Sequence, residues 1–150
     1  MRDYSGDGKF DLAINLYTAF GYFEKIEDDR RVLRNLMKSL KPGGLAVLQM
    51  SPKERLLKIF LPETWQEIEG AFLLEQHTPS ADWSILHNRW IHFGSDGIKT
   101  EWEFGLRLYS AVELRNEMLA VGFDSVEIFG DLTGAPFAPA PRWLVAVGRK

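Results

Sequence analysis

Apolar and polar positions follow two different periods in the first part of the chain. Phe10 to Tyr17 is almost continuously apolar, which is typical of a strand covered on both faces, as in a parallel sheet. From Glu27 to Leu40 the apolar residues recur at the spacing of an amphipathic helix, and Asp28 or Asp29 is placed to cap its start. The pattern predicts a strand followed by a helix.

A second strand and two short helices are expected next. The proline and glycines of Lys41 to Gly44 are typical of a helix end, and Leu45 to Met50 reads as another buried strand. A strand, helix, strand unit of this kind predicts two parallel strands with a right-handed crossover. Beyond it, Lys53 to Phe60 and Glu63 to Glu69 have weak helical patterns, separated by Pro62.

The clearest alternating pattern lies in the second half of the chain. Trp83 to Phe93 and Ile98 to Tyr109 flank Asp96-Gly97, a strong β-hairpin signal. With a two-residue Asp-Gly loop, Trp90 and Arg107 are predicted to share one face of the hairpin.

The last part of the chain predicts a helix and two strands. Ser110 and Glu113 have the spacing of a capping box, so a helix should begin there and end before Gly122. Ser125 to Gly130 and Trp143 to Val147 then read as strands. The predicted fold class is α/β, with a mixed sheet that has two parallel strands at one side, an antiparallel closing pair, and an inserted β-hairpin.

Composition narrows the classes of protein. The chain has 150 residues, of which 45% are hydrophobic and 26% charged, so residues 1–150 are expected to form a single domain. No apolar stretch is long enough for a membrane span, and the start lacks a secretory signal, so a cytoplasmic location is expected.

Several kinds of site are excluded or disfavoured. The chain has no cysteine, which rules out disulfides, thiolate metal ligands and a cysteine nucleophile. The three histidines lack the spacing of a metal site, so no metal is expected. The net charge is only −3 and the basic residues are dispersed, which argues against nucleic-acid binding.

Three segments together resemble a known family. They are "FDLAINLYTAFGYFE" from Phe10, "VLRNLMKSLKPGGLAVLQM" from Val32, and "GLRLYSAVELRNEMLAVGFDSVEIFGDLTGAPF" from Gly105. In order and spacing they resemble the fourth strand, the following helix and strand, and the closing strands of class I S-adenosylmethionine-dependent methyltransferases that act on small molecules. The resemblance covers the C-terminal part of that fold only. It implies a partial Rossmann-like sheet and S-adenosylmethionine as the cofactor.

The glycine-rich loop and the acidic residue with which this family binds its cofactor lie upstream of the matching segments. The resemblance therefore implies that this chain alone binds S-adenosylmethionine poorly. It also implies an unpaired edge at Phe10 to Tyr17, which needs a cover. We expect either a homodimer through this strand or a separate N-terminal half. A truncated enzyme, a noncatalytic dimeric ligand-binding or interaction remnant, and one half of a split enzyme all remain open.

Ligands of open α/β sheets bind at the carboxyl ends of the strands, which here indicates Asn15 to Tyr22 and Gln49 to Ser51. Some residues are candidates for cofactor binding, through hydrogen bonds, close backbone approach or an aromatic face against the sulfonium. Others are candidates for substrate binding, although aromatic clusters more often form core, and Arg107 more often pairs with a glutamate. The cofactor candidates are Asn15, Tyr17, Thr18 and Gly21; the substrate candidates are Phe20, Tyr22, Trp90, Arg107 and Tyr109. No catalytic residue is assigned.

Overall fold

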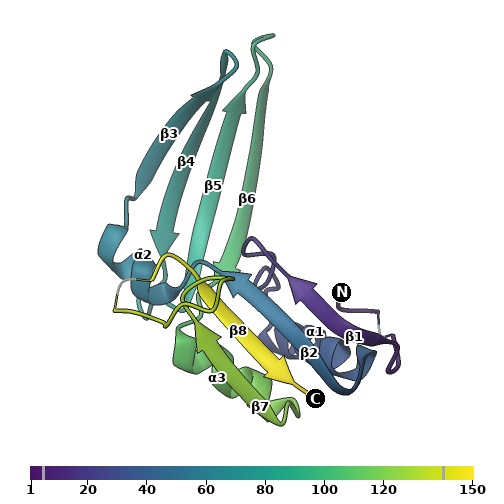
Figure 1. Cartoon of the computed structure of the whole chain (residues 1–150). Helices are drawn as coiled ribbons and strands as arrows, with labels where there is room; N and C mark the ends of the chain where they lie inside the picture. The colour runs from purple at the N-terminus through teal and green to yellow at the C-terminus, as the bar shows by residue number, and fades with distance from the viewer. Residues whose placement is uncertain (5, 140) are drawn as a thin grey trace. The chain divides into compact units, whose positions relative to one another are not determined.

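The strands form two separate four-stranded sheets, here called sheet A and sheet B (Figure 1). The computed structural model describes residues 1–4, 6–139 and 141–150. Two units are distinguished: unit 1 consists of Met1–Lys58 with Tyr109–Lys150, and unit 2 is Ile59–Leu108. Sheet A belongs to unit 1 and sheet B to unit 2, so the two sheets are described separately.

Sheet A has the strand order β1-β2-β8-β7. β1 and β2 are parallel, whereas β8 runs antiparallel to both of its neighbours. This arrangement confirms the predicted mixed sheet with two parallel strands at one side and an antiparallel closing pair. The strands are β1 (Phe10–Asn15), β2 (Leu40–Met50), β7 (Ser125–Phe129) and β8 (Leu144–Arg149). Within the described residues β1 is an edge strand, as expected.

Two helices, α1 (Ile26–Ser39) and α3 (Ala111–Ala120), cover one face of sheet A (Figure 1). Alternate strand residues point toward them, because side chains of a strand alternate between faces. Leu48 and Ala146 are adjacent in the register, and both are fully buried in this core. Leu33 of α1 and Leu114 of α3 close the core from the helix side.

The N-terminus of α3 is capped as predicted, whereas that of α1 is not. α3 begins with the predicted capping box, in which Ser110 Oγ accepts from the Glu113 amide at 3.2 Å and the Glu113 carboxylate accepts from the Ser110 amide at 2.7 Å. The predicted aspartate cap of α1 is wrong, because Lys25 occupies the N-cap position without a side-chain hydrogen bond. Asp29 is instead a buried residue inside α1.

Sheet B has the order β3-β4-β5-β6, and every neighbouring pair is antiparallel. The predicted hairpin therefore forms half of a larger inserted sheet. The helix predicted at Glu63 to Glu69 is wrong, since these residues form β3, which pairs with β4 through a turn at Glu69 and Gly70, both with positive φ. The strands are β3 (Glu63–Ile68), β4 (Ala71–Pro79), β5 (Ile85–Phe93) and β6 (Lys99–Arg107); α2 (Lys53–Ile59) precedes them, where a helix was predicted.

The loop between β5 and β6 is longer than predicted, and this changes which side chains share a face. The last strand pair is Phe93 opposite Lys99, and the Gly94 amide donates to the Ile98 carbonyl across the loop at 2.9 Å. The register is thus one residue away from that of a two-residue loop. A one-residue change turns a strand's side chains to the other face. Trp90 and Arg107 therefore lie on opposite faces of sheet B, and the predicted shared face is wrong.

Candidate functional site at the ends of β1 and β2

The chain turns sharply after β1. Tyr17 and Thr18 both have a φ of 56°, a left-handed conformation that non-glycine residues seldom adopt and that costs about 1 kcal/mol or more per residue. Hydrogen bonds to β2 hold the turn: the Tyr17 amide donates to Gln49 Oε1 at 3.1 Å, and the Thr18 amide donates to the Gln49 carbonyl at 3.1 Å. In return, Thr18 Oγ1 accepts from the Ser51 amide at 2.9 Å. The two carboxyl ends are therefore joined into one rigid corner.

Asn15 is the last residue of β1, just before this corner, and is only 4% exposed. Its Nδ2 donates to the Ala19 carbonyl at 3.5 Å and lies 3.2 Å from Met1 Sδ. Its Oδ1 is buried without a hydrogen-bond partner among the described residues. A buried acceptor that is left unpaired costs free energy, so Asn15 offers an oxygen for a ligand donor.

The aromatic residues after the corner have different surroundings. Tyr17 is 81% exposed and Tyr22 is 48% exposed, whereas Phe20 is buried against the ring of Tyr109, with ring centroids 5.4 Å apart. Partial burial raises the pKa of the Tyr22 hydroxyl. Gly21 has a φ of 100°, which a side chain would oppose. The corner therefore offers Tyr17 and Tyr22 to a ligand, while Phe20 lies in the core.

Tyr109, a substrate candidate from the sequence, is buried and makes a hydrogen bond to another buried side chain. Its hydroxyl donates to Asp29 Oδ2 at 3.0 Å, and both side chains are buried. The bond ties α1 to the segment before α3. Gln49 belongs to the segment expected to form the ligand site, and its side chain holds the corner through the Tyr17 amide. The sequence indicates Asp29 only as a helix cap and does not reveal its buried contact with Tyr109. The presence of a charged residue among the apolar positions of α1 was the available signal for Asp29.

The remaining candidates lie elsewhere. Trp90 and Arg107 belong to sheet B in unit 2 and are on its two different faces.

The loop after β7 contains an acidic residue, Asp131, which is not among the candidates selected from the sequence. Its carboxylate accepts from Thr133 Oγ1 at 2.7 Å and from the Thr133 amide at 2.8 Å. These hydrogen bonds lower the pKa of the Asp131 carboxyl. The contacts explain Asp131 as a loop-forming residue.

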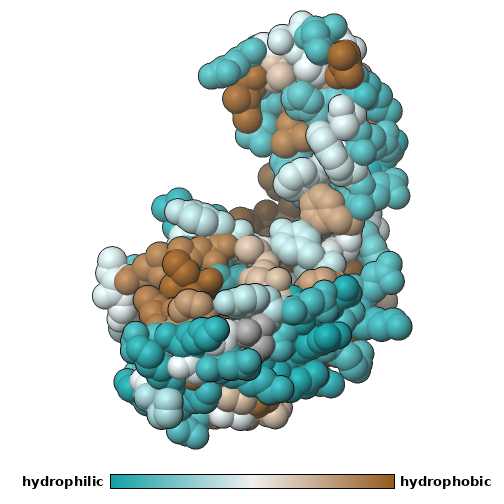
Figure 2. Space-filling model, turned by 90° about the vertical axis from the view of Figure 1, so that its right-hand side faces the viewer, coloured by the Kyte–Doolittle hydropathy of each residue, from teal (hydrophilic) through white to brown (hydrophobic). Residues whose placement is uncertain are grey.

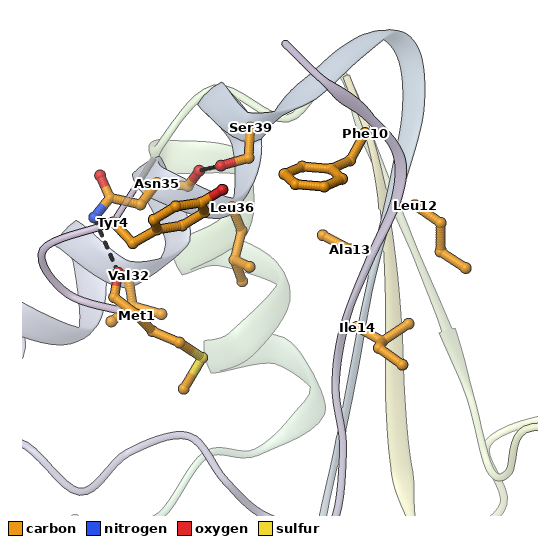
Figure 3. Close-up of a pocket in the computed structure, with 10 residues that line it drawn as sticks. All are labelled: Met1, Tyr4, Phe10, Leu12, Ala13, Ile14, Val32, Asn35, Leu36 and Ser39. Carbon is orange, nitrogen blue, oxygen red and sulfur yellow. Dashed lines mark hydrogen bonds between the residues drawn. The ribbon is translucent and has the colours of Figure 1, made fainter. Parts of the chain in front are cut away.

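The outer edge of sheet A is apolar. Leu12 is 54% exposed and Ile14 is 59% exposed, and both project away from α1, whereas the Phe10 ring points toward it (Figure 3). Leu12 and Ile14 continue a row with Leu45 and Val47 of β2, which are half-buried. Apolar side chains gather at the surface of unit 1 (Figure 2). At β1 and β2, sheet A therefore has an open apolar face opposite the face that α1 and α3 cover.

A hollow of about 220 Å³ adjoins this edge, between β1 and α1 (Figure 3). Its walls are mostly apolar, with Asn35 as a polar exception, whose Nδ2 donates to the Arg2 carbonyl at 2.5 Å. The lining residues are Met1, Tyr4, Phe10, Leu12, Ala13, Ile14, Val32, Asn35, Leu36 and Ser39. The hollow has room for one or two apolar side chains from a neighbouring strand.

Comparison with known proteins now bears on this geometry. No protein-family model and no curated protein sequence matches the chain. Solved structures do match. The S-adenosylmethionine-dependent methyltransferase from Clostridium acetobutylicum aligns with a TM-score of 0.82 at 12% identity, over 99% of this chain and 61% of that protein. The chain has part of a methyltransferase fold.

Two further methyltransferases support the same fold. The CcbJ methyltransferase from Streptomyces caelestis aligns with a TM-score of 0.79 at 18% identity, over 95% of this chain and 61% of that protein. CalS10 is an amino pentose methyltransferase from Micromonospora echinaspora that was solved with S-adenosylmethionine bound. It aligns with a TM-score of 0.66 at 20% identity, over 99% of this chain and 61% of that protein. The chain thus spans about 61% of the length of these proteins. The family expected from the sequence is confirmed at the level of the fold.

Metal sites and membrane-spanning helices place different requirements on the described residues. In the described part of the chain, no group of three or more histidine, aspartate and glutamate side chains is placed to hold a metal ion. Nor does any described helix have both the length and the hydropathy that a membrane span requires.

Proposed function

We propose that this chain forms part of an S-adenosylmethionine-dependent methyltransferase that methylates a small molecule. The observation that carries the proposal is the methyltransferase fold with a rigid corner at the carboxyl ends of β1 and β2, which is where open α/β sheets bind ligands. The sugar substrate named for CalS10 makes an amino sugar one candidate acceptor.

The cofactor-binding residues expected from the sequence fit this role. Asn15 Oδ1, buried and unpaired, is an acceptor for an amino group of the cofactor. Gly21 allows close approach of the backbone, Thr18 holds the corner, and the exposed ring of Tyr17 is available to a sulfonium through a cation–π contact. When bound, S-adenosylmethionine supplies a methyl group whose bond to sulfur breaks as the bond to the acceptor nucleophile forms. The chain's own residues orient the two reactants.

The proposed substrate contacts are Tyr22 in unit 1, and Trp90 and Arg107 in unit 2. Tyr22 is placed at the corner, where its exposed ring is available to an acceptor molecule. Phe20 and Tyr109 support the corner from below through their ring contact. Trp90 and Arg107 of sheet B stay predictions as substrate contacts, and the two cannot act from one face of that sheet.

We further propose that the open face of sheet A and the edge of β1 are covered by the remaining portion of the fold. Support comes from the exposed Leu12 and Ile14, from the adjoining hollow, and from the length of the solved methyltransferases, of which this chain spans 61%. A further segment of the same polypeptide or a second polypeptide would supply that portion. The homodimer expected through β1 competes for the same edge.

Isothermal titration with S-adenosylmethionine tests the proposal. This chain alone should release little heat. The longer protein, made by extending the reading frame upstream or by adding the second polypeptide, should bind at micromolar concentration. Asn15→Leu should weaken that binding, whereas Trp65→Ala on sheet B should not. Micromolar binding by this chain alone would contradict the claim that cofactor binding needs the remaining portion of the fold. If the longer protein did not bind S-adenosylmethionine, the proposed function would be contradicted.

A further inference from the structure

One face of sheet B carries an unusual group of aromatic side chains, here called the aromatic hollow. Trp90 of β5 lies opposite Trp102 of β6, and His92 of β5 lies opposite Leu73 of β4. Two positions from Trp102 on the same strand, and so on the same face, lies Phe104. These five side chains line a hollow of about 460 Å³, which is within the size range of small-molecule pockets.

The rings in the aromatic hollow are fixed by contacts with one another. Trp90 meets Phe104 edge to face, with centroids 5.0 Å apart and planes at 84°. The centroids of His92 and Trp102 are 6.4 Å apart. Trp102 is nevertheless 48% exposed, so much of its ring surface is left to solvent. Rings held in this way present a preformed apolar surface, which lowers the entropic cost of binding a flat ligand.

One side chain that lines the hollow has a polar group without a hydrogen-bond partner among the described residues. The Trp90 indole Nε1–H is buried and makes no hydrogen bond within the described residues. An indole nitrogen is a donor only, and a buried donor normally has an acceptor. A ligand with an oxygen or ring-nitrogen acceptor would satisfy it.

The lining also excludes several ligand classes. Among the described residues that line the hollow, none has a carboxylate, ammonium or guanidinium group to compensate the desolvation of a charged ligand. Glu75 lies opposite Trp90 on the same face, but it is not among the lining residues, and its carboxylate accepts from Thr64 Oγ1 at 3.0 Å. The opposite face of sheet B carries more charged residues, such as Arg89, which pairs with Glu101 at 2.5 Å. The aromatic hollow is therefore a place for an uncharged ligand.

We propose that the aromatic hollow binds a flat, uncharged aromatic ring system that carries a hydrogen-bond acceptor, with its faces against Trp102 and its acceptor on Trp90 Nε1. The site lies within unit 2 and does not depend on methyl transfer or on the cover of sheet A.

Two probes of similar shape test the proposal by titration calorimetry. Coumarin is bicyclic, neutral and has a carbonyl acceptor, whereas naphthalene is bicyclic and has none. Coumarin should bind about tenfold more tightly, the value of one hydrogen bond to a buried donor. Trp90→Phe should abolish this difference, because it removes the donor and keeps an aromatic ring. Trp102→Ala should weaken both probes about tenfold, because it removes stacking surface.

Trp65→Ala is the matched control, since Trp65 is 69% exposed and lies on the opposite face of sheet B, so both probes should bind as before. Circular dichroism spectra confirm that each variant is folded. Equal affinity for the two probes, or unchanged binding by Trp102→Ala, would overturn the proposal. So would the absence of binding by both probes.

Discussion

At β1 and β2 both faces of sheet A carry apolar side chains, but the two faces differ in burial. On the face toward α1 and α3, Leu48 and Ala146 are fully buried. On the other face, Leu12 and Ile14 keep more than half of their surface exposed. Strands of a parallel α/β sheet are normally covered on both faces, which is why they read as continuous apolar runs. The difference indicates that the sequence of β1 is adapted to a cover that the described residues supply on one face only.

Removing a side chain from the covered face has the largest expected effect. Leu48→Ala should lower the free energy of unfolding by about 2–5 kcal/mol, because it deletes buried methyl groups and leaves a cavity. Urea denaturation followed by circular dichroism measures the change. A loss below about 0.5 kcal/mol, as is usual for surface positions, would show that the two faces do not differ.

Removing the buried hydrogen bond between Tyr109 and Asp29 should have the second largest effect on stability. Tyr109→Phe removes the donor to Asp29 Oδ2 and should cost about 1–3 kcal/mol, since a buried carboxylate oxygen then loses a partner. Thermal unfolding of the variant measures this. Tyr17→Phe is the control, because Tyr17 is 81% exposed and the loss of its hydroxyl should leave the melting temperature unchanged. Equal shifts in the two variants would contradict the assignment.

The capping box of α3 should have a smaller effect. Ser110→Ala removes the acceptor for the Glu113 amide and should cost about 1 kcal/mol in urea denaturation. Ser110→Asn keeps a capping side chain and should recover most of the loss. A full loss in both variants would indicate that the serine acts through packing.

The same box predicts a pH dependence. Burial alone would raise the pKa of Glu113, but the hydrogen bonds from Ser110 and the charge of Lys53 lower it overall. Because the folded pKa is lowered, the stability from this carboxylate is present above the ordinary glutamate pKa and is lost as pH falls through the folded value. Glu113→Gln should therefore reduce the acid dependence of unfolding in urea between roughly pH 5 and pH 3. An unchanged dependence would contradict this role.

A change on the open face should have the smallest effect on stability. Ile14→Asp should alter the free energy of unfolding of this chain by no more than about 0.5 kcal/mol, because the side chain is 59% exposed. It should also reduce any self-association through β1, measured by light scattering against protein concentration. A loss as large as that of Leu48→Ala would mean that the open face is part of the core.

Sheet A was largely predictable from the sequence, whereas the β5–β6 hairpin was the predictable part of sheet B. The apolar run from Phe10, the helical spacing from Glu27 and the capping box at Ser110 are local signals that agree with the packing. Glu63 to Ile68 carries no decisive local signal, and pairing with β4 makes it a strand. The register of β5 and β6 depended on loop length, which Asp96-Gly97 alone does not fix.

The strands that lead into the corner were predicted, but the contacts of the corner were not. Fold rules locate a ligand site after Asn15, which needs only the strand ends. The role of Gln49 as an acceptor for the Tyr17 amide depends on tertiary structure. The burial of Phe20 against Tyr109 joins residues far apart in the sequence, and periodicity does not reveal such pairs.

The most direct test measures S-adenosylmethionine binding by the protein that contains the remaining portion of the fold, with and without Ile14→Asp. The account predicts that this substitution, which leaves the stability of the isolated chain nearly unchanged, weakens cofactor binding at least about tenfold, because it buries a charge under the cover of sheet A. Unchanged binding in the Ile14→Asp variant would show that this face is an outer surface, and would contradict the account.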